Sequence, residues 1–139
     1  MSAIVVAVAN QKGGVGKTTT TVNLGHAFAE SGVPTLIVDI DPQANATSAL
    51  GFEKKDGAGI YGPLTGDGAA FDRVIATRTE NLWLLPSELD LAAAELELGA
   101  QPDYLLKLRE CLEKLKEDYG LRLILLDCPD FPRCPSIAR

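Results

Sequence analysis

Cysteine is scarce in this chain, and the few that are present limit the classes of protein it can be. The three cysteines are Cys111, Cys128 and Cys134, an odd number with no pair at a spacing typical of metal ligands. Nothing resembles a secretory signal with its charged start and small-residue cleavage site. We therefore expect a protein of the reducing cytoplasm rather than a secreted one.

Positive charge and long apolar runs are lacking as well. The chain has 13 lysines and arginines against 19 aspartates and glutamates, so its formal net charge is −6. Such a chain lacks the basic surface that attracts nucleic acid, and any DNA contact requires a local patch or residues outside this chain. No apolar run approaches the ~20 residues that a bilayer span needs, so we expect a soluble protein with no membrane partner.

What the chain does contain is enough apolar material for one domain. It has 139 residues, of which 46% are hydrophobic. That length and composition predict a single folded unit with its own core.

A run rich in glycine and lysine follows the apolar segment 4–9 and precedes a segment with helical character. It consists of Gln11, Lys12, Gly13, Gly14, Val15, Gly16, Lys17, Thr18 and Thr19. Glycines let the backbone turn its N–H groups inward onto phosphates without a Cβ clash. Lys17 can then reach the β- and γ-phosphates, and the Thr18 hydroxyl can ligate Mg²⁺. The run predicts a phosphate-binding loop that holds a nucleotide together with Mg²⁺.

This loop departs from the usual P-loop pattern at one position. The pattern has a glycine four residues before the Gly-Lys-Thr unit, and here Gln11 stands there with a second lysine, Lys12, beside it. The spacing resembles that of the ParA/MinD class of ATPases, whose signature lysine corresponds to Lys12.

Three nearly continuous aliphatic segments, 3–9, 35–38 and 121–126, predict buried parallel strands. Polar residues follow each one: residues 10–12 after the first, Asp39 and Asp41 after the second, and Asp127 after the third. Open α/β sheets place their ligands at this edge. The fold predicted is therefore α/β, a doubly wound, mainly parallel P-loop sheet with helices on both faces.

Other segments complete the expected order of elements. Residues 17–31 and the stretch from Pro102 to Gly120 predict helices, residues 81–86 a short strand, and residues 89–98 a short acidic helix. The apolar face of the first helix is expected to comprise Val22, Leu24, Ala27 and Phe28, and that of the second Leu105, Leu108, Leu112, Leu115 and Tyr119. The glycine-rich stretch 51–68 is either a nucleotide-sensitive loop or a plain surface excursion.

Phosphoryl transfer to water needs a positioned nucleophile, a metal and matching positive charge. We expect Asp41 to hold the attacking water, and Lys12 and Lys17 to supply the charge. Thr18 is expected to ligate Mg²⁺ directly and Asp127 to act through a metal-bound water. Asp39 either caps nearby backbone or lies in the second shell around the magnesium.

A second stretch makes the resemblance more specific. Asp39-Ile40-Asp41-Pro42-Gln43, followed by residues 44–51, is similar to the ParA/Soj branch of partitioning ATPases, and the resemblance runs from residue 3 to about 129. It implies ATP hydrolysis with Asp41 as the hydrolytic aspartate, and an ATP-dependent homodimer in which Lys12 reaches the partner's nucleotide. It also implies association with nonspecific DNA, a ParB-like centromere-binding partner, and DNA segregation as the function.

The resemblance ends near residue 129, which divides the chain into 1–129, the N-terminal part of a ParA-like ATPase domain, and 130–139, a divergent proline-rich tail. Pro129, Pro132 and Pro135 are incompatible with the helix that follows in the family. We expect a truncated gene or a shifted reading frame at this point, which would leave the first strand with a bare edge and the chain without the DNA-binding residues. The alternatives are a nucleotide-binding module without turnover, or another ATPase of the class that acts in division-site placement, flagellar number or cofactor assembly.

Overall fold

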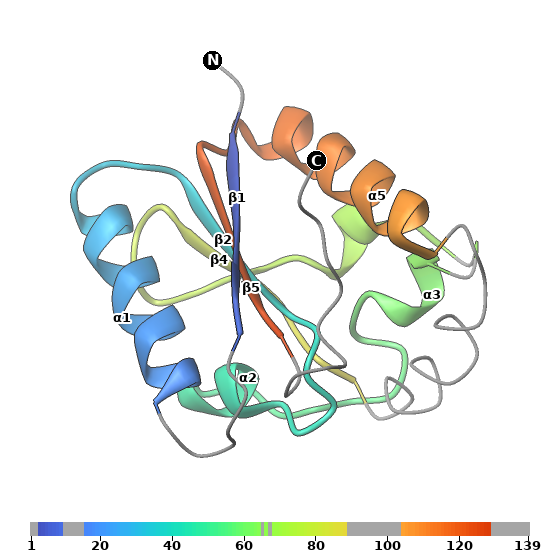
Figure 1. Cartoon of the computed structure of the whole chain (residues 1–139), viewed down its shortest axis with the longest axis horizontal. Helices are drawn as coiled ribbons and strands as arrows, with labels where there is room; N and C mark the ends of the chain where they lie inside the picture. Colours follow the sequence, from blue (N-terminus) through green and yellow to red (C-terminus); the bar gives the residue numbers. More distant parts are fainter. Residues whose placement is uncertain (1–2, 10–15, 65, 67, 89–103, 129–139) are drawn as a thin grey trace.

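The computed structural model describes residues 3–9, 16–64, 66, 68–88 and 104–128. Figure 1 shows a twisted sheet with helices packed around it. The strands are β1 (Ile4–Val8), β2 (Thr35–Asp39), β3 (Ile75–Ala76), β4 (Leu82–Leu85) and β5 (Leu123–Asp127). The helices are α1 (Lys17–Glu30), α2 (Asn45–Ala49), α3 (Tyr61–Leu64), α5 (Tyr104–Tyr119) and the 3₁₀ turn η1 (Ala70–Arg73).

The sheet is mainly parallel, with strand order β1-β5-β2-β4-β3. Strands β1, β5, β2 and β4 run parallel, and the two-residue β3 pairs antiparallel to β4. The register places Asp127 beside Val8 on one side and beside Asp39 on the other. The parallel α/β architecture is confirmed, and three strands therefore end together at one edge of the sheet.

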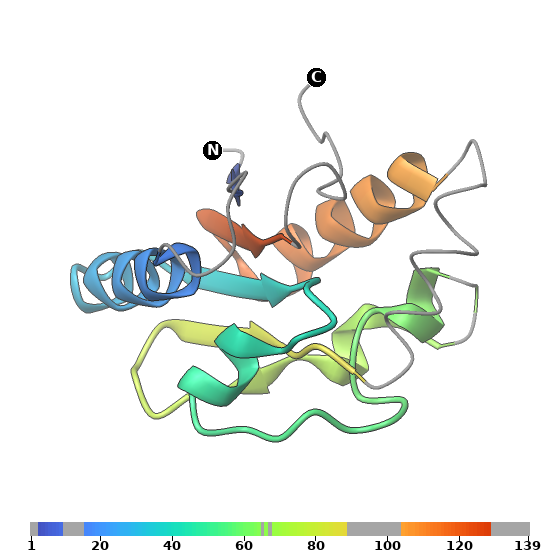
Figure 2. The same ribbon diagram turned by 60° about the horizontal axis from the view of Figure 1, so that its bottom comes forward.

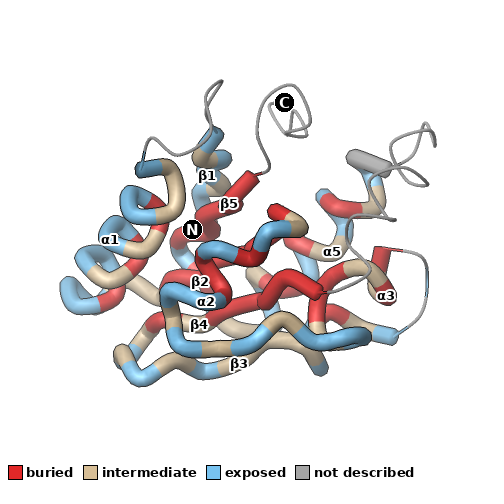
Figure 3. The backbone as a smooth tube through the Cα atoms, turned by 90° about the horizontal axis from the view of Figure 1, so that it is seen from below, coloured by how far each residue is buried: buried red, intermediate tan, exposed pale blue. Residues whose placement is uncertain are grey.

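Each face of the sheet packs against a different helix because side chains alternate along a strand. In β2, Leu36 and Val38 belong to the core cluster that contains Leu108 and Leu112 of α5. Ile37, between them, belongs to a second cluster with Ala29 of α1. Figure 3 shows β2 and β5 as continuous buried segments between these layers. The core thus has two parts, one on each side of the central strands.

Helix α1 packs mainly through small side chains, and the face predicted for it is wrong except at Val22, which packs against the core. Its buried residues are Thr21, Gly25 and Ala29, whereas Leu24 and Phe28 are 38% and 43% exposed. A Cβ on Gly25 would lie 2.7 Å from the Cδ1 of Ile37, so the helix comes too close to the sheet for a larger residue. The i, i+4, i+8 stripe of small residues therefore faces β2, and the larger residues turn outward.

The remaining expectations have mixed outcomes. Helix α5 is confirmed, with Leu108, Leu112 and Leu115 buried, and so is the strand predicted over 81–86. The glycine-rich stretch 51–68 contains α3, and Ile60 and Leu64 are each 1% exposed, so this part is not a plain surface excursion. The acidic helix predicted over 89–98 lies outside the described residues. In the described stretches, every helix is too short or too polar to cross a membrane.

Strand β1 lies at the edge of the sheet, where it pairs with β5 on one side (Figure 2). Ile4 is 66% exposed and Val6 is 38% exposed, so the burial predicted for segment 3–9 is wrong. The bare edge expected for this strand is present among the described residues. An uncharged β-branched edge strand is a template for pairing with another chain.

A charge on this edge is expected to suppress self-association without unfolding the protein. Ile4→Lys places an ammonium on the outward side of β1, and since Ile4 is already largely exposed, the free energy of unfolding should change by less than about 0.5 kcal/mol. Light scattering during heating measures the effect, and the onset of aggregation should move to higher temperature. Leu106→Lys is the matched control, because Leu106 is 55% exposed on α5. Equal protection by both variants would show that β1 is not the aggregating edge.

Candidate functional site

The candidate site lies where β1, β2 and β5 end and α1 begins. In Figure 1 the first turn of α1 and the short helix α2 lie together at this edge of the sheet. Gly16, just before α1, has φ +84°, a left-handed conformation that glycine adopts without strain. The chain can therefore turn sharply there, and Lys17 becomes the first residue of the helix.

Lys17 is held between two aspartates from two different strands. Its Nζ lies 2.5 Å from Oδ1 of Asp127 and 3.6 Å from Oδ2 of Asp41. Partial burial alone would lower the pKa of Lys17, but its hydrogen bond to Asp127 and the charges of Asp127, Asp41 and Asp39 together raise it. Lys17 is therefore a fixed ammonium at neutral pH.

Asp127 is completely buried, and hydroxyl groups of α1 surround its carboxylate. The Thr18 hydroxyl donates to Oδ2 at 3.1 Å, and the Thr21 hydroxyl approaches Oδ1 at 3.4 Å while also donating to the Lys17 carbonyl at 3.0 Å. Two of these partners, Thr18 and Lys17, lie in the first turn of the helix. The fold therefore brings the Asp127 carboxylate into contact with the Thr18 hydroxyl and the Lys17 ammonium.

Asp41 completes the cluster from the loop after β2. Its side chain is 9% exposed, and Oδ1 accepts a hydrogen bond of 3.0 Å from the backbone N–H of Gln43 while Oδ2 faces Lys17. The carboxylate is thus fixed on both sides. Asp41, the carboxylate expected to hold the attacking water, therefore keeps a small solvent-exposed area.

Asp39 is also completely buried, but its oxygens are turned toward the backbone of its own loop. Oδ1 accepts from the N–H of Asp41 at 3.1 Å, and Oδ2 accepts from both the N–H and the hydroxyl of Thr47, at 2.9 and 2.7 Å. This is the geometry of the capping alternative. A place in the second shell around magnesium stays a prediction.

Burial has a measurable consequence at Asp39. Desolvation, helped by the nearby charge of Asp127 and opposed by the hydrogen bonds from Thr47 and Asp41, raises the pKa of Asp39 from 3.8 to about 6. Since the folded-state pKa is above the unfolded one, its contribution to stability is fully present below pH 3.8 and is lost as the pH rises through 6. A shift of about two units corresponds to about 3 kcal/mol.

Asp39→Asn is therefore expected to remove a pH dependence. Urea unfolding without nucleotide and with a chelator, from pH 4 to 7, gives the free energy of unfolding of both proteins. The wild-type value minus the variant value should fall by about 2 kcal/mol across this range, most of the full difference. A difference independent of pH would show that Asp39 does not titrate there.

The structure describes only some of the residues predicted for the site. Gln11, Lys12, Gly13, Gly14 and Val15 lie outside the described residues. Thr19 lies in the first turn of α1 with its residue surface exposed. Lys17, Thr18, Asp41 and Asp127 are brought together, and their proposed roles stay predictions.

Three buried hydroxyl residues of this region were missed by sequence reasoning. They are Thr21, Thr47 and Ser87, each with 0% exposure. Ser87 follows the end of β4, and its place after a buried strand was the available signal, whereas Thr47 lies in α2 and has no such signal.

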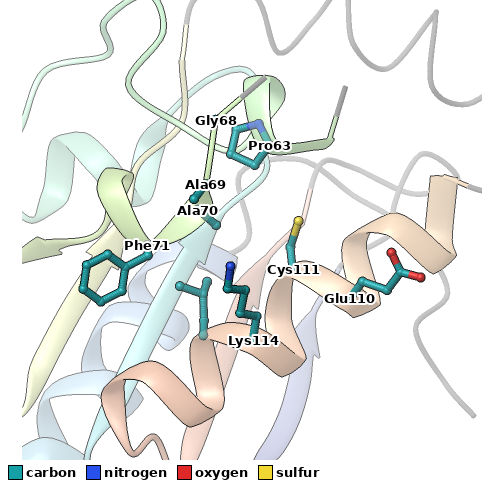
Figure 4. Close-up of a pocket in the computed structure, with 9 residues that line it drawn as sticks. Pro63, Gly68, Ala69, Ala70, Phe71, Glu110, Cys111 and Lys114 are labelled. Atoms are coloured by element: carbon teal, nitrogen blue, oxygen red, sulfur yellow. The ribbon is translucent and has the colours of Figure 1, made fainter. Parts of the chain in front are cut away.

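A separate hollow of about 220 Å³ lies away from the strand ends (Figure 4). Residues of α3, η1 and α5 line it, including Phe71, Cys111 and Lys114. Burial raises the pKa of the Cys111 thiol. No residue of the aspartate and lysine cluster lines this hollow, so it is not part of the candidate site.

The cluster can be tested for its fit to Mg²⁺ and a polyphosphate. Within the described residues, no group of three or more histidine, cysteine or acidic side chains is placed to hold a metal by itself. Magnesium commonly takes one or two protein oxygens together with substrate phosphates and water, and Thr18 and Asp127 offer such oxygens. Lys17 adds the positive charge that phosphates need. The residues present fit the group.

Comparison with known proteins places the chain in a family. Residues 3–136 match a family model described as an AAA domain, AAA_31. The chain is 47% identical over 126 residues to the sporulation initiation inhibitor protein Soj of Bacillus subtilis, covering 90% of this chain and 49% of Soj. It is 39% identical over 126 residues to the chromosome partitioning protein ParA of Caulobacter vibrioides, covering 90% of this chain and 47% of ParA.

A solved structure gives the same picture. Cobyrinic acid a,c-diamide synthase from Mycobacterium smegmatis, with bound ADP and magnesium, superposes with a TM-score of 0.83 at 38% identity, over 93% of this chain and 51% of that one. The chain spans about half the length of the curated relatives it matches. The chain belongs to the AAA_31 family of AAA domains, and it is similar to the ParA and Soj proteins over that half.

Proposed function

We propose that this chain is the nucleotide-binding half of a ParA/Soj-type partitioning ATPase. The observation that carries the proposal is the ion-paired cluster at the strand ends, where Lys17 lies 2.5 Å from Asp127 and 3.6 Å from Asp41. The cluster unites an ammonium for phosphates, oxygens for magnesium and a carboxylate for water. Those are the three requirements of phosphoryl transfer to water.

Each residue has a distinct role in this proposal. Mg²⁺ neutralises charge on the β- and γ-phosphates when bound. Lys17 exchanges part of its contact with Asp127 for the phosphates, and the Thr18 hydroxyl ligates the metal. Asp127 would hold the metal through water, and Asp41 would orient the attacking water and accept its proton. Lys12, with the rest of the loop 11–16, completes the phosphate cradle and reaches the nucleotide of a second subunit.

The proposed cellular role follows from similarity to partitioning proteins. ATP-dependent dimerisation, association with nonspecific DNA and stimulation by a ParB-like centromere-binding protein together couple hydrolysis to DNA segregation. The protein then acts in the cytoplasm, on the nucleoid. The net charge of −6 supports our view that the basic DNA-binding residues lie outside this chain.

A second function is favoured by one observation, the coverage of about half of each relative. It is a nucleotide-binding module without turnover. The likeness to a cobyrinic acid a,c-diamide synthase also keeps open another role within the same ATPase class, in cofactor assembly, beside division-site and flagellar roles.

Phosphate release from Mg-ATP distinguishes the two functions. The purified chain is mixed with a slight excess of ATP, and phosphate is followed alongside nucleotide binding by calorimetry. Binding with phosphate release beyond one equivalent supports the ATPase, and binding without release supports the module. Light scattering on a sizing column with and without ATP then tests dimerisation, and DNA retardation at two salt concentrations tests association with DNA.

A further inference from the structure

The loop that carries Asp41 is held by side chains on both of its main-chain polar groups. The Asp41 N–H donates to Oδ1 of Asp39 at 3.1 Å. Its carbonyl accepts from the Ser87 hydroxyl at 2.7 Å, and from the Ala44 N–H at 2.9 Å. The backbone of Asp41 is therefore bonded to Ser87, a residue 46 positions away.

Thr47 closes these contacts into a ring. Its N–H and hydroxyl both donate to Oδ2 of Asp39, and its hydroxyl oxygen accepts from the Ser87 N–H at 2.9 Å. The ring runs from Asp39 to Asp41, to Ser87, to Thr47 and back to Asp39. Asp39, Thr47 and Ser87 are each 0% exposed and Asp41 is 6% exposed, so water does not compete for these bonds.

Backbone strain at Ala44 also indicates that the Asp41 loop is held in one conformation. Ala44 has φ +59° and ψ +35°, a left-handed conformation that a residue with a Cβ rarely adopts. Such strain costs of order 1–3 kcal/mol and persists where the surroundings over-determine the conformation. The hydrogen-bonded ring holds this conformation, because it fixes Asp41 before Ala44 and Thr47 after it.

The ring joins three elements of the sheet edge. Asp39 ends β2, Thr47 lies in α2, and Ser87 follows β4. Glu88, next to Ser87, accepts a hydrogen bond of 2.5 Å from the Tyr61 N–H at the start of α3. The segment after β4 therefore contacts the loop of Asp41 through one residue and α3 through the next.

We infer that Thr47 and Ser87 are positioning residues, which fix the Asp41 carboxylate beside Lys17 by holding the backbone of the Asp41 loop. This inference rests on the proposed ATPase function and assigns no contact between these two hydroxyls and the nucleotide. Lys17 and Thr18 belong to α1, outside the ring. Loss of a ring hydroxyl should therefore lower turnover more than nucleotide affinity.

Four variants test this role. Thr47→Val and Ser87→Ala remove the hydroxyls, Thr47→Ser keeps one, and Ser48→Ala is the matched control on the exposed side of α2. Displacement of a reacting group by about 1 Å costs about 100-fold in rate. We expect kcat for ATP to fall 10- to 100-fold in the first two variants, with KM within about threefold, while Thr47→Ser and Ser48→Ala stay near wild type. Unchanged kcat, or kcat and affinity falling together, overturns the inference.

Hydrogen exchange gives a readout that does not need turnover. The Gln43 N–H donates directly to the Asp41 carboxylate, so its exchange rate reports the position of that carboxylate. Exchange at Gln43 should rise at least tenfold in Ser87→Ala and Thr47→Val, with exchange in α1 unchanged. If wild type shows no turnover, the proposed function fails and this exchange alone decides the positioning role. Unchanged exchange at Gln43 in both variants overturns it.

Discussion

Asp41→Ala is expected to remove ATP hydrolysis and to leave ATP binding within a few fold of wild type. A positioned group that orients water and accepts its proton contributes about 10²–10⁴-fold, and the rate should fall by that factor. Lys17 keeps its contact with Asp127 in this variant, and Thr18 keeps its hydroxyl, so the phosphate and metal contacts remain. Single-turnover phosphate release measures the rate, and calorimetry measures the affinity.

Asp56→Ala is the matched control, because Asp56 is an exposed acid on the loop after α2. It changes the net charge by the same amount as Asp41→Ala and should leave both quantities unchanged. A hydrolysis rate that survives in Asp41→Ala would remove Asp41 from its proposed role. Equal loss of binding and hydrolysis would mean that Asp41 supports the site as a whole.

Lys17→Ala is expected to weaken ATP binding about 100-fold or more. Hydrogen bonds to charged groups contribute about 1.5–3 kcal/mol each, and 1.4 kcal/mol is a factor of ten, so the loss of two such bonds to phosphate reaches that size. Calorimetric titration with Mg-ATP measures the change. Lys55→Ala is the matched control, since Lys55 is exposed on the loop after α2.

The same substitution also affects stability, and a second variant separates the two effects. Asp127 is 0% exposed, and removing its cation leaves a buried carboxylate without its ion pair, which costs about 3–5 kcal/mol. The double variant Lys17→Ala with Asp127→Asn removes both charges and should recover much of this stability while still failing to bind ATP. Tight binding by the well-folded double variant would contradict the role of Lys17.

The sequence predicted the candidate site better than it predicted the packing around it. Asp39, Asp41 and Asp127 were placed at one edge because each follows an aliphatic run, and parallel pairing brings such ends together. That inference needs only the strand direction. The register of β2 with β5 and the orientation of their aspartates then follow from the continuous burial of these two strands.

Packing that depends on close approach could not be predicted in the same way. The face of α1 was assigned by hydrophobicity, but Gly25 lets the helix approach Ile37, and this turns Leu24 and Phe28 outward. The hydrogen-bonded ring was missed for a similar reason. Thr47 and Ser87 are 40 positions apart, and neither has a local pattern that marks a buried partner.

Thermal unfolding of this chain with and without Mg-ATP tests whether the cluster of Lys17, Asp41 and Asp127 binds nucleotide. A ligand at a hundred times its Kd adds ~2.7 kcal/mol of stability, which for a domain of this size raises Tm by roughly 5–10 °C. We expect one cooperative transition that Mg-ATP shifts upward in wild type and leaves in place in Lys17→Ala. Absence of a shift in wild type, or an equal shift in both proteins, would contradict nucleotide binding at the cluster of Lys17, Asp41 and Asp127.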